Sequence, residues 1–205
     1  MKSNRIEANK RNRSKALEVA YRPDEVYRGI VYVAVSSGDN DDWKEYSCYI
    51  DELPDLLERL HVDDISNEKN RKNIYITHNS FKTFRGRADN DDVKAKAGLF
   101  SYNNFVIDID CHDKSISISQ NYTLMHNLIP ILSTELSNVI PCWSIAHYTG
   151  RGLQLWWCFE QVSRELHGPY RITLCRMIEE IDRILQMDKY SEYKCVHVDK
   201  TSKKE

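Results

Sequence analysis

The sequence predicts an α+β fold, in which a ferredoxin-like (RRM-like) βαββαβ catalytic module packs with a smaller N-terminal α/β lobe. From residue 99 onwards, stretches with strand-like alternation and stretches with helical spacing follow one another in the order β-α-β-β-α-β. The chain has 205 residues, of which 41% are hydrophobic and 29% charged, a composition typical of globular proteins. This length suits one sizeable domain or two small lobes that share a core.

Hydrophobic periodicity locates the elements of the module. Apolar alternation predicts strands, and apolar residues three and four apart predict helices. The expected elements are a strand at 102–110, a helix at 119–138, strands at 143–148 and 153–159 joined by a tight turn, a helix at 163–187 and a last strand at 194–199. In this topology the first strand is central, the third and fourth strands flank it antiparallel, and the helices leave one sheet face open.

The N-terminal part is expected to contain a basic arm, residues 1–22, and a lobe that covers about 23–98. The arm is helical by its pattern and carries six basic residues against one acidic residue within 1–15. Such an arm can lie along phosphates, but a solvated tail or helix is the better explanation of a charge run alone. In the lobe we expect strands at 26–35, 45–50 and 73–77, a helix at 51–60 capped by Asp51, and a polar loop at 78–98. The catalytic domain as a whole would span 23–205, with its RRM-like module at about 99–200.

Composition excludes several classes of protein. No apolar run approaches the roughly 20 residues of a membrane span, and the polar N-terminus contains no secretory segment. The six cysteines form no Cys-x-x-Cys pair, so we interpret them as small apolar residues in a reducing compartment. We therefore expect a cytoplasmic protein with no membrane partner.

Two aspartates stand on one face of the first module strand. Alternation places Phe105, Ile107 and Ile109 under the helices, so Asp108 and Asp110 share the open face. Asp199, at the end of the last strand, would reach the same face. Three converging carboxylates can hold one or two hard divalent ions such as Mg²⁺ or Mn²⁺. The alternative is that the aspartates only cap a strand end.

A turn of Thr149, Gly150, Arg151 and Gly152 precedes the third strand. Turn amides between glycines can form an anion nest, and an arginine adds a forked donor suited to phosphate. Gln154 would face the open side beside the aspartates. The alternative is an ordinary hairpin in which the glycines only satisfy the turn geometry.

Three motifs in this order resemble the archaeo-eukaryotic primase superfamily, and most closely the primase–polymerase domains of plasmid and mobile-element replication proteins. They are Phe-Val-Ile-Asp-Ile-Asp at 105–110, Tyr-Thr-Gly-Arg-Gly-Leu-Gln-Leu-Trp-Trp at 148–157 and Val-His-Val-Asp at 196–199. The stretch Tyr-Ile-Thr-His-Asn-Ser-Phe at 75–81 resembles the segment that precedes the metal motif in such plasmid proteins. The resemblance covers roughly residues 70–199.

The resemblance implies that Asp108, Asp110 and Asp199 bind a catalytic divalent metal, Mg²⁺ or Mn²⁺. It also implies a nucleotide-binding role for the turn and the strand after it, and this set comprises Thr149, Gly150, Arg151 and Gln154. Gln154 stands where many members of the superfamily have a phosphate-contacting histidine, whereas His147 lies before the turn and receives no role. The chain stops soon after the third motif, which suggests an excised catalytic domain or a short member of the superfamily.

These observations predict a DNA primase/polymerase that carries out template-directed nucleotidyl transfer in the replication of a plasmid or mobile element. Its partners would be single-stranded DNA and nucleoside or deoxynucleoside triphosphates, with a helicase or other replication protein as a further candidate. Polar and basic side chains after the third lobe strand are candidate DNA or nucleotide contacts, namely Asn79, Lys82, Arg85 and Arg87. Two alternatives stay open: a metal-dependent nuclease, and a non-catalytic RRM-like module that binds single-stranded nucleic acid.

Overall fold

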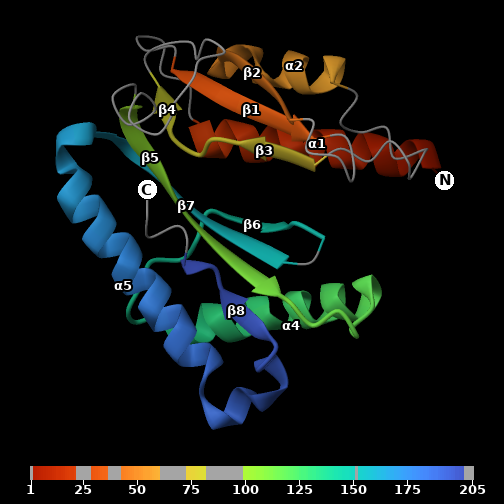
Figure 1. Cartoon of the computed structure of the whole chain (residues 1–205), viewed down its shortest axis with the longest axis vertical. Coiled ribbons are helices and arrows are strands. Elements are labelled where there is room, and N and C mark those ends of the chain that lie inside the picture. The colour runs from red at the N-terminus through yellow and green to blue at the C-terminus, as the bar shows by residue number, and fades with distance from the viewer. Residues whose placement is uncertain are drawn as a thin grey trace. The chain divides into compact units, whose positions relative to one another are not determined.

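The computed structural model describes residues 2–21, 29–36, 43–60, 73–81, 99–150 and 152–200. The chain divides into two compact units. The first contains residues 1–103 together with 160–164, and the second contains 104–159 together with 165–205. The fold is α+β, with antiparallel strand pairing and several helices (Figure 1).

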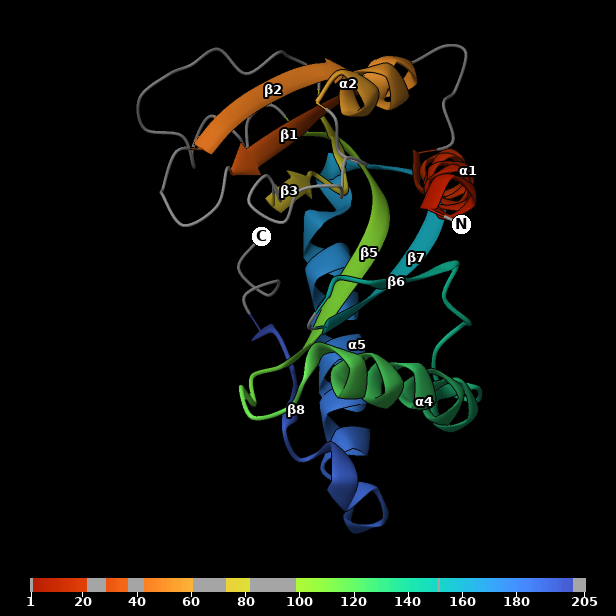
Figure 2. The same cartoon turned by 90° about the vertical axis from the view of Figure 1, so that its right-hand side faces the viewer.

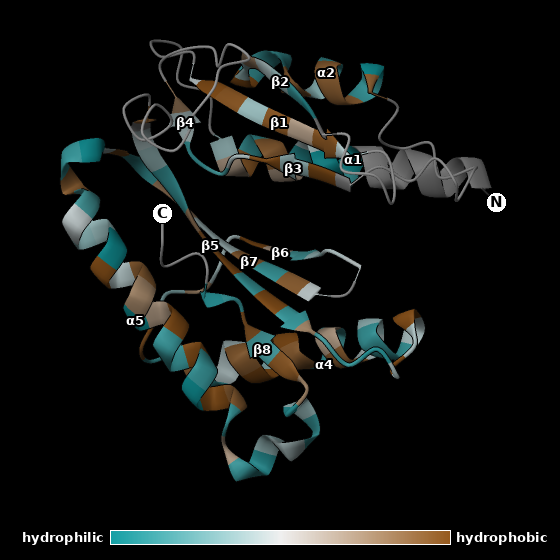
Figure 3. Cartoon of the chain, viewed as in Figure 1, coloured by the Kyte–Doolittle hydropathy of each residue, from teal (hydrophilic) through white to brown (hydrophobic). Residues whose placement is uncertain are grey.

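The first unit is built around β1 (Ile30–Ser36), a strand that is buried along almost its whole length. Antiparallel to β1 lie β2 (Trp43–Tyr49), β3 (Asn73–Ile76) and the short β4 (Ser80–Phe81). β4 in turn pairs with the start of β5 (Leu99–Cys111). Because both faces of β1 are covered, its residues are apolar without alternation, and its ribbon is largely brown in Figure 3.

Helices complete this unit. The predicted basic arm forms α1 (Lys2–Tyr21), and its last residues are buried, with the Tyr21 hydroxyl donating to the Thr77 carbonyl at 2.7 Å. A 3₁₀ turn, η1 (Ile50–Glu52), leads into α2 (Leu53–Arg59), which buries three leucines. The expected cap Asp51 is wrong: α2 begins after Glu52, whose carboxylate instead accepts the Tyr49 N–H.

The second unit contains the end of β5 and five further main elements. In chain order these are α4 (Ile118–Leu136), β6 (Ile145–Tyr148), β7 (Gly152–Ser163), α5 (His167–Leu185) and β8 (Val196–Val198). The 3₁₀ helix η3 (Arg164–Leu166) precedes α5, and η4 (Asp188–Tyr193) follows it. Ser117 and Gln120 form a capping box that starts α4 at Ile118, one residue earlier than the apolar spacing indicated.

The strands of this unit lie in the order β8-β5-β7-β6, so β5 has β8 on one side and β7 on the other (Figure 2). β8 pairs antiparallel with β5, with Val198 opposite Ile109 and His197 opposite Asp110. β6 and β7 form an antiparallel hairpin in which His147 faces Gln154 and Tyr148 faces Leu153.

One face of this sheet packs against the helices. α4 and α5 contact each other, and α5 contacts β8. Tyr170 of α5 stacks on Phe105 with ring centroids 4.6 Å apart, which fixes the face of β5 that the helix covers. The next residues on the same face of β5 as Phe105 are buried, and so are the inward residues of β7 and β8. These buried residues are Ile107, Ile109, Leu153, Leu155, Trp157, Val196 and Val198.

Candidate active site on the open face of the sheet

The open face of the second unit carries the aspartates that the sequence placed there. Asp108 and Asp110 are partly exposed, whereas Ile107 and Ile109, which alternate with them, are fully buried against the helices. On β8 the valines are buried, so His197 and Asp199 turn to the same face as the aspartates. Strand alternation therefore gathers polar side chains from adjacent strands on one surface.

Four polar residues form a row across the four strands, here called the Asp108 row. His147 of β6 is paired with Gln154 of β7, and the Gln154 Nε2 donates to the Asp108 Oδ2 at 3.1 Å. On the other side of β5, the Asp199 N–H donates to the Asp108 carbonyl at 2.8 Å. This backbone bond places Asp199 beside Asp108, as cross-strand neighbours are placed in an antiparallel pair.

Gly152 and His197 flank Asp110 in the next row. A methyl group on Gly152 would collide with the Asp110 carboxylate and would lie 2.6 Å from the Ile109 carbonyl oxygen. The glycine therefore lets the start of β7 approach the end of β5, which brings the 149–152 turn to the aspartates. His197 is paired with Asp110 on the β8 side and stacks on His112 with centroids 6.1 Å apart.

Burial and mutual repulsion make the two β5 carboxylates hard to ionise. Desolvation raises the pKa of Asp108; the Gln154 hydrogen bond opposes this, and the charges of Asp110 and Asp199 add to it. Desolvation also raises the pKa of Asp110, with His112 opposing and Asp199 adding. The three carboxylates thus lie within range of one another's charge.

The turn between β6 and β7 is held by several hydrogen bonds. The Thr149 N–H donates to the Gly152 carbonyl at 3.0 Å, and the Gly152 N–H donates to the Thr149 Oγ1 at 3.1 Å. Gly150 has φ +106°, a conformation that favours glycine. The turn therefore needs its threonine and its first glycine for backbone reasons, whatever it binds.

Tyr148 ties this turn to the start of α4. Its hydroxyl contacts the Gly150 carbonyl and lies 3.2 Å from the Asn121 Oδ1 and 3.4 Å from the Ile118 carbonyl. One phenolic hydrogen can serve only one of these oxygens. The Asn121 Nδ2 is buried and has no hydrogen-bond partner among the described residues. If the Asn121 amide is turned by half a rotation, its Nδ2 donates to the Tyr148 hydroxyl, and both groups then have a partner.

The carboxylates are close but do not form a preformed metal cage. Within the described ranges, no three His, Cys, Asp or Glu side chains converge closely enough to hold an ion. The Asp108 Oδ1 is nevertheless buried and has no hydrogen-bond partner in the part of the chain that the structure describes. A buried, unpartnered carboxylate oxygen is costly, and it is a suitable ligand for a hard cation.

The remaining candidate residues fall into two groups. Asn79 is 7% exposed, and its Oδ1 accepts the Asn103 N–H at 2.9 Å within the first unit, so it has a backbone-bracing contact there. The basic candidates lie outside the described residues, and they are Lys82, Arg85, Arg87 and Arg151.

His147 is the site residue that the sequence reasoning missed. It precedes the turn, which made it look remote, yet the hairpin register places it directly opposite Gln154. The signal was available: when Thr149 and Gly152 close a four-residue turn, Tyr148 must pair with Leu153 and His147 with Gln154. Counting the register, rather than the distance along the chain, would have found it.

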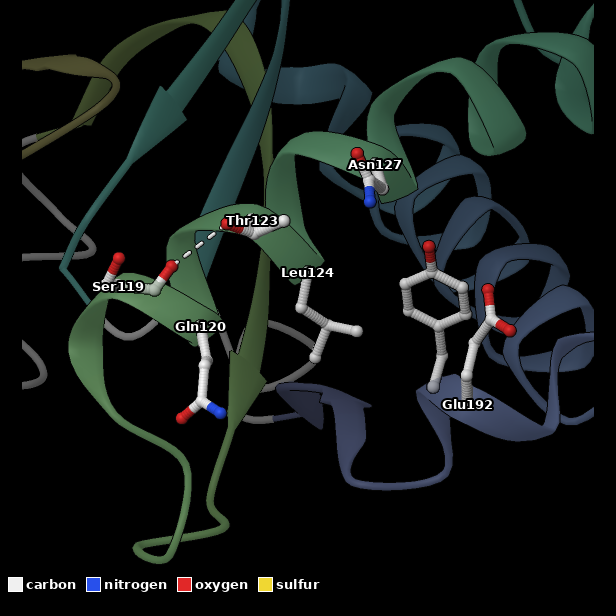
Figure 4. Close-up of a pocket in the computed structure, with 7 residues that line it drawn as sticks. Ser119, Gln120, Thr123, Leu124, Asn127 and Glu192 are labelled. Atoms are coloured by element: carbon white, nitrogen blue, oxygen red, sulfur yellow. Dashed lines mark hydrogen bonds between the residues drawn. The ribbon is translucent and has the colours of Figure 1, made fainter.

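A pocket of about 370 Å³ lies elsewhere in this unit, between the first turns of α4 and the segment η4 (Figure 4). Polar side chains such as Ser119, Thr123 and Glu192 line it, and Figure 4 shows them around Leu124. It contains none of the predicted site residues, and its walls come from helical elements rather than from the open face of the sheet.

Comparison with known proteins identifies no relative: no protein-family model, no curated protein and no solved structure matches the chain. None of the helices that the structure describes combines the length and the apolar character needed to cross a membrane. None of the six cysteines forms a disulfide in the part of the chain that the structure describes.

Proposed function

We propose that the chain is a metal-dependent nucleotidyltransferase, acting as a DNA primase/polymerase of the archaeo-eukaryotic type. One observation carries the proposal: three carboxylates from two adjoining strands share an open sheet face beside a glycine-rich turn. The order of strands β8-β5-β7-β6, with helices on one face, supports a ferredoxin-like or RRM-like module as the scaffold. A template-copying enzyme of this kind would work in the cytoplasm on single-stranded DNA.

The residues fit a divalent cation. Asp108, Asp110 and Asp199 would hold Mg²⁺ or Mn²⁺, because hard ions prefer carboxylate oxygens and the Asp108 Oδ1 is buried without a partner among the described residues. When bound, such ions activate a 3′-hydroxyl and neutralise charge on a leaving pyrophosphate. The paired strands fix the backbone of all three aspartates, so side-chain rotation would suffice for them to converge.

The protein's own groups would orient the triphosphate. Gln154 holds the Asp108 Oδ2, and the other oxygen, the buried Oδ1, is left without a hydrogen-bond partner among the described residues. The 149–152 turn places the Thr149 hydroxyl near Asp110, where phosphates on a carboxylate-bound ion would lie. The charges that raise the pKa values of Asp108 and Asp110 also favour a cation there.

The test is synthesis on single-stranded DNA with labelled ribo- or deoxynucleotides and Mg²⁺ or Mn²⁺, with the products sized on a gel. Wild type should make or extend chains, and Asp108→Asn with Asp110→Asn should abolish synthesis while circular dichroism stays unchanged. Undiminished synthesis by the double variant would contradict the assignment. Metal-dependent shortening of DNA without nucleotides would instead indicate a nuclease that uses the same carboxylates.

A further inference from the structure

A chain of polar side chains runs across three strands of the open face, from His147 through Gln154 to Asp108. The β6–β7 register places His147 opposite Gln154 on the same face, and Gln154 Nε2 donates to Asp108 Oδ2 at 3.1 Å. His147 and Gln154 are therefore cross-strand neighbours on the open face. His147 lies on the edge strand, so it forms the outer end of this chain.

The chemistry of an amide fixes the direction of this chain. Gln154 has one donor end and one acceptor end, and its Nε2 is directed at Asp108. The carbonyl end therefore accepts from His147, whose imidazole must donate an N–H. In agreement, the bond to Gln154 raises the pKa of His147, although desolvation has the larger effect and lowers it below its usual range. The imidazole carries an N–H donor in either protonation state.

Without that donor, only the Asp108 carboxylate would hold the Gln154 amide, and the carbonyl end of the amide would have no partner from His147. Turned by half a rotation, the amide would point its carbonyl oxygen at the Asp108 carboxylate, two acceptors facing each other. We propose that His147 is a positioning residue of the site: its N–H holds the Gln154 amide so that Nε2 fixes one oxygen of Asp108 and leaves the other oxygen available to a divalent cation. The cation in this statement rests on the proposed function, whereas the orientation of Gln154 does not.

The orientation is tested on the metal-free protein by NMR of the Gln154 side-chain amide. In wild type, the Nε2 protons should exchange slowly and resonate apart from those of exposed glutamines. His147→Ala should bring both properties close to solvent-exposed values. An amide nitrogen restores the donor, so His147→Asn, which reproduces Nδ1, or His147→Gln, which reproduces Nε2, should recover the wild-type signal. His126→Ala, an exposed histidine on α4, is the matched control and should change nothing.

The consequence for the ion is tested by Mn²⁺ titration of the same variants. Partners of this kind typically change metal affinity by 10- to 100-fold, so we expect roughly a ten-fold loss in His147→Ala and recovery in the rescuing amide variant. Wild-type amide signals in His147→Ala would overturn the inference, as would altered signals with unchanged Mn²⁺ affinity. If wild type binds no Mn²⁺, the proposed function is wrong, and so is the part of the inference that concerns the cation. The amide NMR still decides whether His147 orients Gln154.

Discussion

Replacing Gly152 by alanine should be the most informative single change in the second unit. The new methyl would meet the Asp110 carboxylate and stand 2.6 Å from the Ile109 carbonyl oxygen and 3.1 Å from the Thr149 Oγ1. Ordinary contacts begin near 3.4 Å, so the β5 and β7 backbones must part by about 0.8 Å at this point. A carboxylate can rotate away, but a backbone carbonyl in a strand has little freedom to move.

The expected cost is that of overpacking, about 1–3 kcal/mol. For a chain of this length it corresponds to a fall in melting temperature of about 2–12 °C. Urea unfolding followed by tryptophan fluorescence is a suited assay, because Trp143, Trp156 and Trp157 lie in the second unit and only Trp43 lies in the first.

Gly168→Ala is the matched control, since a methyl there meets no atom within 4 Å and the residue lies in α5. It should be neutral or stabilise by up to about 1 kcal/mol through helix propensity. Adding Asp110→Ala to Gly152→Ala should recover part of the loss, because one of the colliding groups is removed. If Gly152→Ala unfolds like Gly168→Ala, the close approach of β7 to β5 is refuted.

Three further predictions follow from the burial and the hydrogen bonds of individual side chains. Burial is the main cause that raises the folded-state pKa of Asp110, so the ionised carboxylate lowers the stability of the fold above that pKa. In EDTA, Asp110→Asn should therefore be more stable than wild type at pH 7. The difference in unfolding free energy should vanish as the pH falls to about 4. Burial raises the pKa of the Cys48 thiol to about 11, so a disulfide reagent at pH 8 should modify exposed Cys142 long before Cys48, and equal rates would contradict this. Tyr148→Phe removes the hydroxyl at Gly150 and should cost about 1 kcal/mol in urea unfolding, with an unchanged midpoint as the contrary result.

The second unit was largely predictable because its signals are local. Alternation in 102–110 and 153–159 and helical spacing in 119–138 and 163–187 each identify one element, and the structure has strands β5 and β7 and helices α4 and α5 there. The face on which Asp108, Asp110 and Asp199 stand also followed from alternation alone. α5 starts later than its apolar spacing indicated, at His167 after a 3₁₀ turn, and Pro169 then lies in its first turn, where a proline is tolerated.

The features that the sequence did not predict depend on pairing between distant segments. β4 has two residues, too few for any periodicity, and is stabilised by pairing with β1 and β5. The return of 160–164 to the first unit likewise depends on where β7 runs and not on its own residues. His147 belongs to the site through hairpin register, which hydrophobic spacing does not encode.

The central claim, that the three aspartates together hold a divalent ion, is tested most directly by Mn²⁺ binding followed by electron paramagnetic resonance. Wild type should bind the ion, and Asp108→Asn, Asp110→Asn and Asp199→Asn should each weaken binding strongly. Asp113→Asn should bind as wild type does, because Asp113 is exposed and engaged with Ser115. Binding that survives all three site substitutions, or that Asp113→Asn weakens as much as they do, would contradict the account.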